Sequence, residues 1–211
     1  MSKEENFIFT TPEGTFSFLK VFKAEQPRLD GKPNPAKKPQ FSTSHVYAPG
    51  TDLTPMKKVI LAAAYAKFGE ETAKKLIKAG SLRLPWKSSD DDKNGESLVS
   101  RYGFPYEEGS FYISPTRLED KGAPQIIDKK GRKIINPDEF YSGCKGYISV
   151  YCYAYDTSGN KGVTLYINSI MKSADGERLG GASSPQADFA HLLGAATTTD
   201  ASDDEEDFLG L

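Results

Sequence analysis

Residues 146–172 read GYISVYCYAYD, then TSGN, then KGVTLYINSIMK, and this stretch decides the fold class. Successive side chains of a β-strand point to opposite faces. Residues 146–156 therefore form a strand with small apolar side chains on one face and tyrosines on the other. Residues 161–172 alternate with the opposite parity, and residues 157–160 have the composition of a hairpin turn. The stretch predicts an antiparallel β-hairpin.

The register of this hairpin follows from its turn. If Thr157 faces Asn160, the strands pair Ala154 with Val163, Cys152 with Leu165 and Tyr151 with Tyr166. Apolar side chains then meet on the inner face and tyrosines meet on the outer face. On the second strand the residues expected inward are Val163, Leu165, Ile167 and Met171, and those expected outward are Thr164, Tyr166, Asn168 and Lys172.

Segments upstream of the hairpin complete a sheet. Residues 15–22 and 40–47 have the β-branched and aromatic composition of strands, and residues 27–39 form a basic, proline-rich loop between them. Further short strands are expected at residues 111–113, 125–127 and 133–135, after an irregular polar region over residues 81–108.

Two helices are expected between the second strand and the later ones. Thr54 is the predicted N-cap and Pro55 the first helical residue, with a break at Gly69 and a second helix from Glu70 to Ala79. The whole pattern predicts a mainly β chain, an OB-fold-like antiparallel barrel with a helical insertion. The helices follow the second strand, whereas the usual OB-fold has its helix after the third.

Charge separates sharply along the chain. Residues 188–211 contain seven carboxylates and neither Lys nor Arg, while residues 1–187 carry 27 basic against 22 acidic residues, a net charge of +5. We expect a domain at residues 1–181, a flexible linker at 182–199 and a disordered acidic tail at 200–211. The tail residues expected to contact partner proteins are Asp203, Asp204, Glu205, Glu206, Asp207 and Phe208. An acidic segment is often only a solubilising terminus, but the apolar Phe208 and Leu209 favour a recognition role.

Several function classes find no support in the sequence. There is no apolar run of about 18 residues for a membrane span, no secretory signal, and only two cysteines, Cys144 and Cys152, which is typical of a reducing compartment. Asp90–Asp92 begins like a calcium loop, but Arg101 stands where a bidentate carboxylate is required. No cofactor, metal ion or catalytic residue is predicted.

The tyrosines are the main candidate site. Ring faces stack on nucleic-acid bases without regard to sequence, while nearby cations hold the phosphates. Packing beneath the helices or the tail is the structural alternative for the same side chains. The candidate nucleic-acid-binding residues are Tyr147, Tyr151, Tyr153, Tyr155 and Tyr166 with Lys145, Lys161 and Lys172, then Trp86, Lys87, Arg101, Tyr102 and Tyr112.

A family resemblance agrees with this interpretation. The residues that carry it are Phe140–Cys144, Tyr153–Tyr155, Gly159–Gly162, Asn168 and Asp175–Gly181, with looser similarity at Phe41–Tyr47, Pro55 and Tyr112–Ser114. Over most of residues 7–181 the chain resembles bacteriophage single-stranded-DNA-binding proteins. The resemblance implies an OB-fold, an acidic C-terminus, a non-enzymatic role and a site in the cytoplasm of a bacterial host. The tail departs from the pattern by continuing past Phe208 to Leu211.

The resulting hypothesis is a sequence-independent single-stranded-DNA-binding protein of phage replication, recombination or repair. Its partners would be single-stranded DNA and, through the tail, replication or recombination proteins, with a homo-oligomer left open. The tail would compete with DNA for the basic domain. The alternatives are a protein-interaction module that uses the tyrosine face, a general binder of DNA and RNA, and a nuclease with carboxylates at Asp90–Asp92.

Overall fold

The computed structural model describes residues 7–29, 32–91 and 95–180. The elements in chain order are β1 (Ile8–Thr10), β2 (Gly14–Glu25), β3 (Arg28–Leu29), β4 (Lys32–Pro33), β5 (Gln40–Tyr47), α1 (Thr54–Phe68), α2 (Glu70–Lys78), β6 (Leu82–Arg83), β7 (Trp86–Ser88), α3 (Leu98–Tyr102), β8 (Phe111–Ile113), β9 (Thr116–Leu118), the 3₁₀ turn η1 (Glu119–Lys121), β10 (Gln125–Ile127), the 3₁₀ turn η2 (Pro137–Glu139), β11 (Lys145–Thr157) and β12 (Asn160–Ala174). The predicted linker and acidic tail lie outside the described residues. Among the described helices, none has the length and apolar character to cross a membrane.

The long β11–β12 hairpin is the backbone of the fold, and its predicted register is confirmed. Thr157 pairs with Asn160, Ala154 with Val163, Cys152 with Leu165 and Tyr151 with Tyr166. The predicted alternation holds through Asn168, which is exposed as expected, and fails after it, because a register shift leaves Asn168 as an extra residue on β12. Ile170 is therefore the buried residue, and the expectation that Met171 faces inward is wrong.

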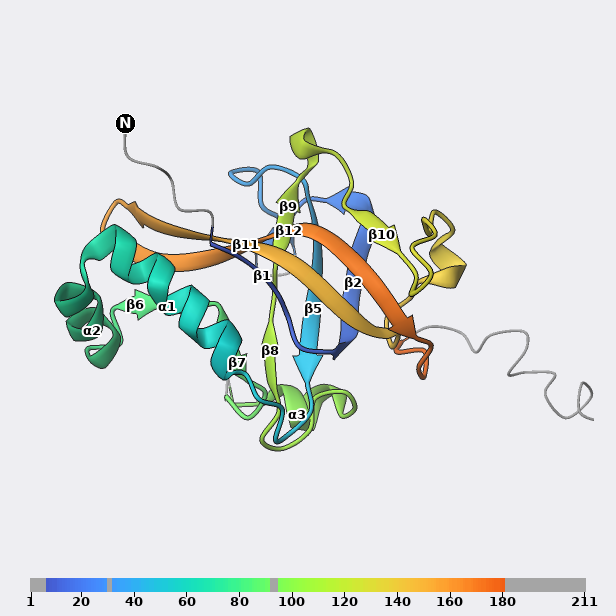
Figure 1. Cartoon of the computed structure of the whole chain (residues 1–211), viewed down its shortest axis with the longest axis horizontal. Helices are drawn as coiled ribbons and strands as arrows, with labels where there is room; N and C mark the ends of the chain where they lie inside the picture. Colours follow the sequence, from blue (N-terminus) through green and yellow to red (C-terminus); the bar gives the residue numbers. More distant parts are fainter. Residues whose placement is uncertain (1–6, 30–31, 92–94, 181–211) are drawn as a thin grey trace, which may run out of the picture. The chain divides into compact units, whose positions relative to one another are not determined.

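Five strands pair in a closed circuit that runs β2–β5–β9–β12–β11 and back to β2 (Figure 1). Figure 1 shows β5 running between β2 and β9 while the β11–β12 hairpin crosses beside them. The pairings are antiparallel except those of β6, β9 and β10 with β12, which are parallel. The mainly β prediction is confirmed, with the correction that the sheet is mixed.

The helical insertion follows β5, the second strand of the circuit, as the sequence indicated. In α1 the buried stripe is Met56, Ile60, Ala63 and Ala64. The predicted cap is wrong by position, since Thr54 is itself helical and makes no side-chain cap. Instead the Asp52 carboxylate accepts the Thr54 N–H at 2.9 Å. Gly69 then separates the helices with φ of +78°, a left-handed backbone conformation that glycine adopts without strain.

Two predictions need correction, the irregular region at residues 81–108 and the short strand at residues 133–135. Residues 81–108 contain β6, β7 and α3, which are too short for hydrophobic periodicity to reveal. Residues 133–135 form no strand, and only a single bridge joins Ile127 to Lys133. Both outcomes reflect long-range pairing, because β7 exists only through its partner β8 and β6 only through β12.

Candidate nucleic-acid interface

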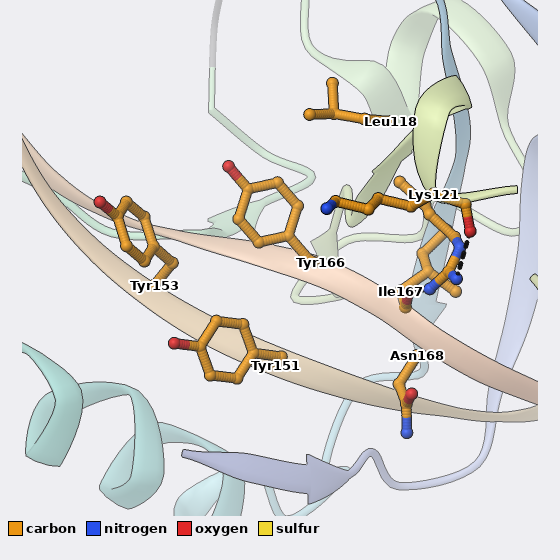
Figure 2. A pocket seen from close by; sticks show the side chains of 8 residues that line it. Leu118, Lys121, Tyr151, Tyr153, Tyr166, Ile167 and Asn168 are labelled. Atoms are coloured by element: carbon orange, nitrogen blue, oxygen red, sulfur yellow. Dashed lines mark hydrogen bonds between the residues drawn. The ribbon is translucent and has the colours of Figure 1, made fainter. Parts of the chain in front are cut away.

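A groove lies on the outer face of the hairpin, and Figure 2 shows its side chains. Tyr151 and Tyr166 are cross-strand neighbours, and Tyr153 lies two residues along β11 on the same face. The ring centroids of Tyr153 and Tyr166 are 6.3 Å apart, and the ring planes make an angle of 47°. The groove has a volume of about 500 Å³. We call it the tyrosine groove, and its lining consists of Arg117, Leu118, Lys121, Tyr151, Tyr153, Tyr166, Ile167 and Asn168.

The second wall of the tyrosine groove comes from β9 and η1. The Arg117 guanidinium donates to the carbonyl oxygens of Ile167 at 3.0 Å, Gly122 at 2.8 Å and Lys121 at 2.7 Å. These bonds tie η1 to β12 and so fix the wall against the tyrosine face. Figure 2 shows the Lys121 side chain extending toward Tyr166. Arg117 is thus a positioning residue, and Lys121 supplies a second cation at the groove.

The Tyr166 hydroxyl in the groove stays neutral. Burial raises the pKa of Tyr166, and the nearby Tyr153 and Tyr151 raise it further because their phenolates would repel another negative charge. Tyr153 is 47% exposed, so its ring face is open to a ligand. The groove therefore offers aromatic faces and the neutral Tyr166 hydroxyl beside one lysine.

The other two tyrosines of the predicted set lie away from the groove. Tyr147 pairs with Met171 at the far side of the bulge. Tyr155 covers Gly162, where an added Cβ would lie 2.7 Å from the Tyr155 hydroxyl oxygen. Both side chains are half-buried and neither lines the groove. The hairpin thus brings together three of its five predicted tyrosines.

The three predicted lysines are dispersed. Lys145 is exposed at one end of β11, and Lys161 forms a salt bridge with Asp156 at 2.9 Å at the other. Lys172 bonds to the Asp175 carboxylate at 2.6 Å and to the Glu139 carbonyl oxygen. It lines a separate hollow with residues of the 128–134 turn. None of the three lines the tyrosine groove.

The upstream aromatic candidates form two further groups. Trp86 is half-buried and has the Lys57 ammonium 5.6 Å from its ring, while Tyr112 is only 8% exposed and meets Tyr106 edge-on. The Lys87 ammonium lies 6.0 Å from the Tyr112 ring.

The second group lies at α3, where Tyr102 is 47% exposed and the Arg101 guanidinium lies 5.5 Å from its ring. Arg101 and Tyr102 thus form an exposed site of their own, apart from the groove.

The described residues hold no cluster of three or more potential metal ligands among His, Cys, Asp and Glu. Asp90 instead organises a loop, accepting bonds from Ser88 and from the Gly109 N–H. Burial raises the pKa of Cys152 to about 12 and also raises that of Cys144, so both thiols stay protonated and unreactive. The candidate tail residues 203–208 lie outside the described part of the chain.

Comparison with known proteins identifies the family. The family model described as the single-stranded-DNA-binding protein of Enterobacter phage Enc34 matches residues 10–209. The chain belongs to this family. No curated protein matches the chain. The family is one of DNA-binding proteins, and this agrees with the expectation of a binding protein and not an enzyme.

Solved structures of phage proteins share the fold. The single-stranded-DNA-binding protein of phage Enc34 in complex with single-stranded DNA aligns with a TM-score of 0.60 at 16% identity, covering 85% of this chain and 96% of that one. Another structure of the Enc34 protein gives 0.58 at 16% identity, covering 90% and 96%. Gp2.5, the single-stranded-DNA-binding protein of phage T7, gives 0.52 at 16% identity, covering 93% and 100%.

Three residues that line the tyrosine groove were not predicted from the sequence, namely Arg117, Leu118 and Lys121. They reach the groove because β9 pairs in parallel with β12 through Tyr166 and Thr116. A parallel contact between segments 50 residues apart leaves no local pattern, so only the basic side chains of Arg117 and Lys121 hinted at a role.

Proposed function

We propose that the tyrosine groove binds single-stranded DNA without sequence preference. The observation that carries this proposal is the grouping of Tyr151, Tyr153 and Tyr166 around one groove in a chain of the Enc34 family. Stacking of a base on an aromatic side chain contributes about 1–3 kcal/mol and tolerates every base. A groove of about 500 Å³ admits a base between the tyrosines and the β9 wall.

The residues that line the groove have different roles in the proposed binding. Tyr153 and Tyr166 offer ring faces to bases, and Lys121 lies where it can neutralise a phosphate. Arg117 has its guanidinium bonded to three backbone carbonyls and so holds the wall in place.

The acidic segment supplies the second half of the proposal. Its seven carboxylates oppose a net charge of +5 on residues 1–187, so it competes with the DNA phosphates for the basic domain. DNA displaces the segment, which then recruits replication or recombination proteins of the phage through residues 203–208. We place this activity in the cytoplasm of the bacterial host.

Fluorescence anisotropy of a labelled oligo(dT), beside a duplex and an RNA of equal length, tests the function. We expect tight, salt-sensitive binding to the DNA single strand and weak binding to the duplex. Equal affinity for the RNA would widen the proposal to both nucleic acids. No binding to any single strand, even at low salt and without residues 200–211, would refute the function and favour a protein partner for the tyrosine face.

Single substitutions test the site. Tyr153→Ala and Tyr166→Ala each remove one ring, and we expect each to weaken oligo(dT) binding by roughly 5- to 150-fold, the equivalent of 1–3 kcal/mol. Tyr166→Phe keeps the ring and serves as the matched control, with near-native affinity. Native affinity of both alanine variants would exclude this groove as the stacking site.

A further inference from the structure

A second aromatic surface lies on the same face of the sheet as the tyrosine groove. Phe18 in β2 is 46% exposed, and its ring meets Tyr102 of α3 edge-on with centroids 5.1 Å apart. Tyr102 is itself 47% exposed and carries Arg101 against its ring. Large exposed aromatic side chains that touch each other are uncommon on a surface without a binding role. We call Phe18, Tyr102 and Arg101 the α3 platform.

Strand pairing connects the α3 platform with the tyrosine groove. Residues directly opposite each other on neighbouring strands share a face, and the register links Tyr166 to Thr116, Thr116 to Ser42 and Ser42 to Lys20. One step along β5, Ser44 pairs with Ser17, and its hydroxyl lies 3.3 Å from that of Ser114. A strip of hydroxyl groups therefore runs from Tyr166 across β9 and β5 as far as β2, where Ser17 is buried and Phe18 follows it.

Aromatic side chains cover the outer face of β5 near Val46, whereas the strip beside it is open. Val46, two residues beyond Ser44 on the same face of β5, is buried beneath Tyr106 and Tyr112. The Phe18 ring packs against Tyr106 at 6.3 Å, at the edge of this cover. Ser42, Ser44 and Thr116 are half-buried and Ser114 is exposed. An open polar strip thus lies between two aromatic surfaces.

The exposed position of Phe18 is held by the backbone at a cost. Phe18 has φ of +48°, a left-handed conformation that costs an L-residue about 1–2 kcal/mol. It lies at the register break between Ser17 and Lys20. The break is fixed on both sides, since Thr43 donates its hydroxyl to the Ser17 carbonyl at 3.1 Å and the Leu19 N–H donates to Ser142 at 3.0 Å. Strain that the surrounding structure maintains at an exposed aromatic residue is typical of a functional site.

We propose that the α3 platform is a second stacking site for the same DNA strand, an inference that rests on the proposed function. Tyr166 and Phe18 are separated by three strand spacings of about 4.8 Å and, at right angles to these, one step of roughly 7 Å along β5, so the straight-line distance between them is about 16 Å. A stacked strand advances at least 3.4 Å per nucleotide, so at most about five nucleotides bridge the two sites. Hydroxyl groups of the strip face the bridging nucleotides, and Arg101, which has Glu96 3.7 Å away as its ion-pair partner, faces the strand at the platform.

Oligonucleotide length separates the two stacking sites. Phe18→Asn suits the left-handed backbone without an aromatic ring, and Tyr102→Ala removes the second ring. We expect each variant of the full chain to weaken binding of (dT)15 about tenfold and to leave (dT)2, whose two adjacent bases cannot span the roughly 16 Å between the sites, within twofold. Tyr102→Phe keeps the ring and should bind both oligomers as the native chain does. Ile135→Ala, which trims an exposed apolar side chain outside both sites, controls for a general surface effect.

The possible outcomes distinguish this inference from the proposed function. If Tyr166→Ala weakens both oligomers while Phe18→Asn and Tyr102→Ala leave (dT)15 unchanged, the function stands and the α3 platform is refuted as a DNA site. A platform that binds a protein partner would give that same result. If the native chain binds neither oligomer, the proposed function fails first. Near-native circular dichroism and thermal unfolding of each variant confirm that affinity, and not folding, has changed.

Discussion

Protonation of the buried His45 makes the fold sensitive to acid. The ring is fully buried between Phe16 and Tyr47. Its Nε2–H donates to the Gly146 carbonyl at 3.1 Å, which leaves Nδ1 to accept from the Tyr47 hydroxyl at 3.0 Å. Burial lowers the pKa of His45 from 6.5 to about 4, although hydrogen bonds to the Gly146 and Gly14 backbone act in the opposite direction. The neutral imidazole is therefore the form that the native state requires.

The sign and size of the effect follow from linkage. Between pH 6.5 and 4 the unfolded chain binds a proton at this position and the native chain does not, so stability falls as the pH falls. With these two pKa values, about 2 kcal/mol is lost by pH 5 and about 3.4 kcal/mol well below pH 4. Above pH 6.5 the contribution is complete.

Urea unfolding followed by circular dichroism at pH 7.5, 6.0 and 5.0 measures this loss. His45→Gln removes the titration while keeping an amide that can donate to Gly146, so its stability should vary much less over the same range. The comparison is made within each variant, because the substitution also lowers stability at every pH. Parallel loss of stability in the native chain and in His45→Gln would show that other groups cause the acid sensitivity and would refute the reasoning.

Two further predictions concern charge. Lys121→Ala should weaken oligo(dT) binding and reduce the slope of log affinity against log salt by about 0.7, the value for one phosphate contact on a single strand. Lys130→Ala, an equal loss of charge at the separate 128–134 hollow, is the control and should leave the slope unchanged. Equal slopes in both variants would show that Lys121 does not contact the DNA. Deletion of residues 200–211 should tighten binding, most at low salt, because mobile ions screen the competition; unchanged or weaker binding in the same titration would contradict the competitor role.

Local alternation predicted the central hairpin well but could not predict its irregularity. The inward and outward positions hold from Ile148 to Ala154 on β11 and from Val163 to Ile167 on β12, because one buried face imposes the period of two. Asn168 breaks the pattern as the extra residue of a bulge, and Ile170 takes the buried position expected for Met171. The position of a bulge depends on how neighbouring strands pair, and a local sequence pattern carries no information about that pairing.

The same limit explains which of the predicted site residues lie together in the groove. Tyr151, Tyr153 and Tyr166 lie near the middle of the hairpin, so their register alone brings them together. Lys145 and Lys161 are close to them in sequence but lie at opposite ends of a 13-residue strand pair, which is about 40 Å long. Lys121 reaches the groove through a parallel pairing between distant segments. Nearness in sequence therefore grouped three predicted tyrosines at one groove, whereas the predicted lysines lie away from it.

This division between rings and cations bears on the proposed competition between the acidic segment and DNA. Arg117 directs its N–H groups to three neutral carbonyl oxygens and keeps its positive charge, so two cations, Arg117 and Lys121, line the groove. Most of the electrostatic attraction for DNA must then come from the summed charge of residues 1–187 and not from contacts inside the groove. Seven carboxylates within the last 24 residues exceed that net charge of +5 and weaken the field without having to occupy the tyrosine face. The gain in affinity on deletion should consequently fall steeply with salt, while the loss caused by Tyr166→Ala, a stacking effect, should change little.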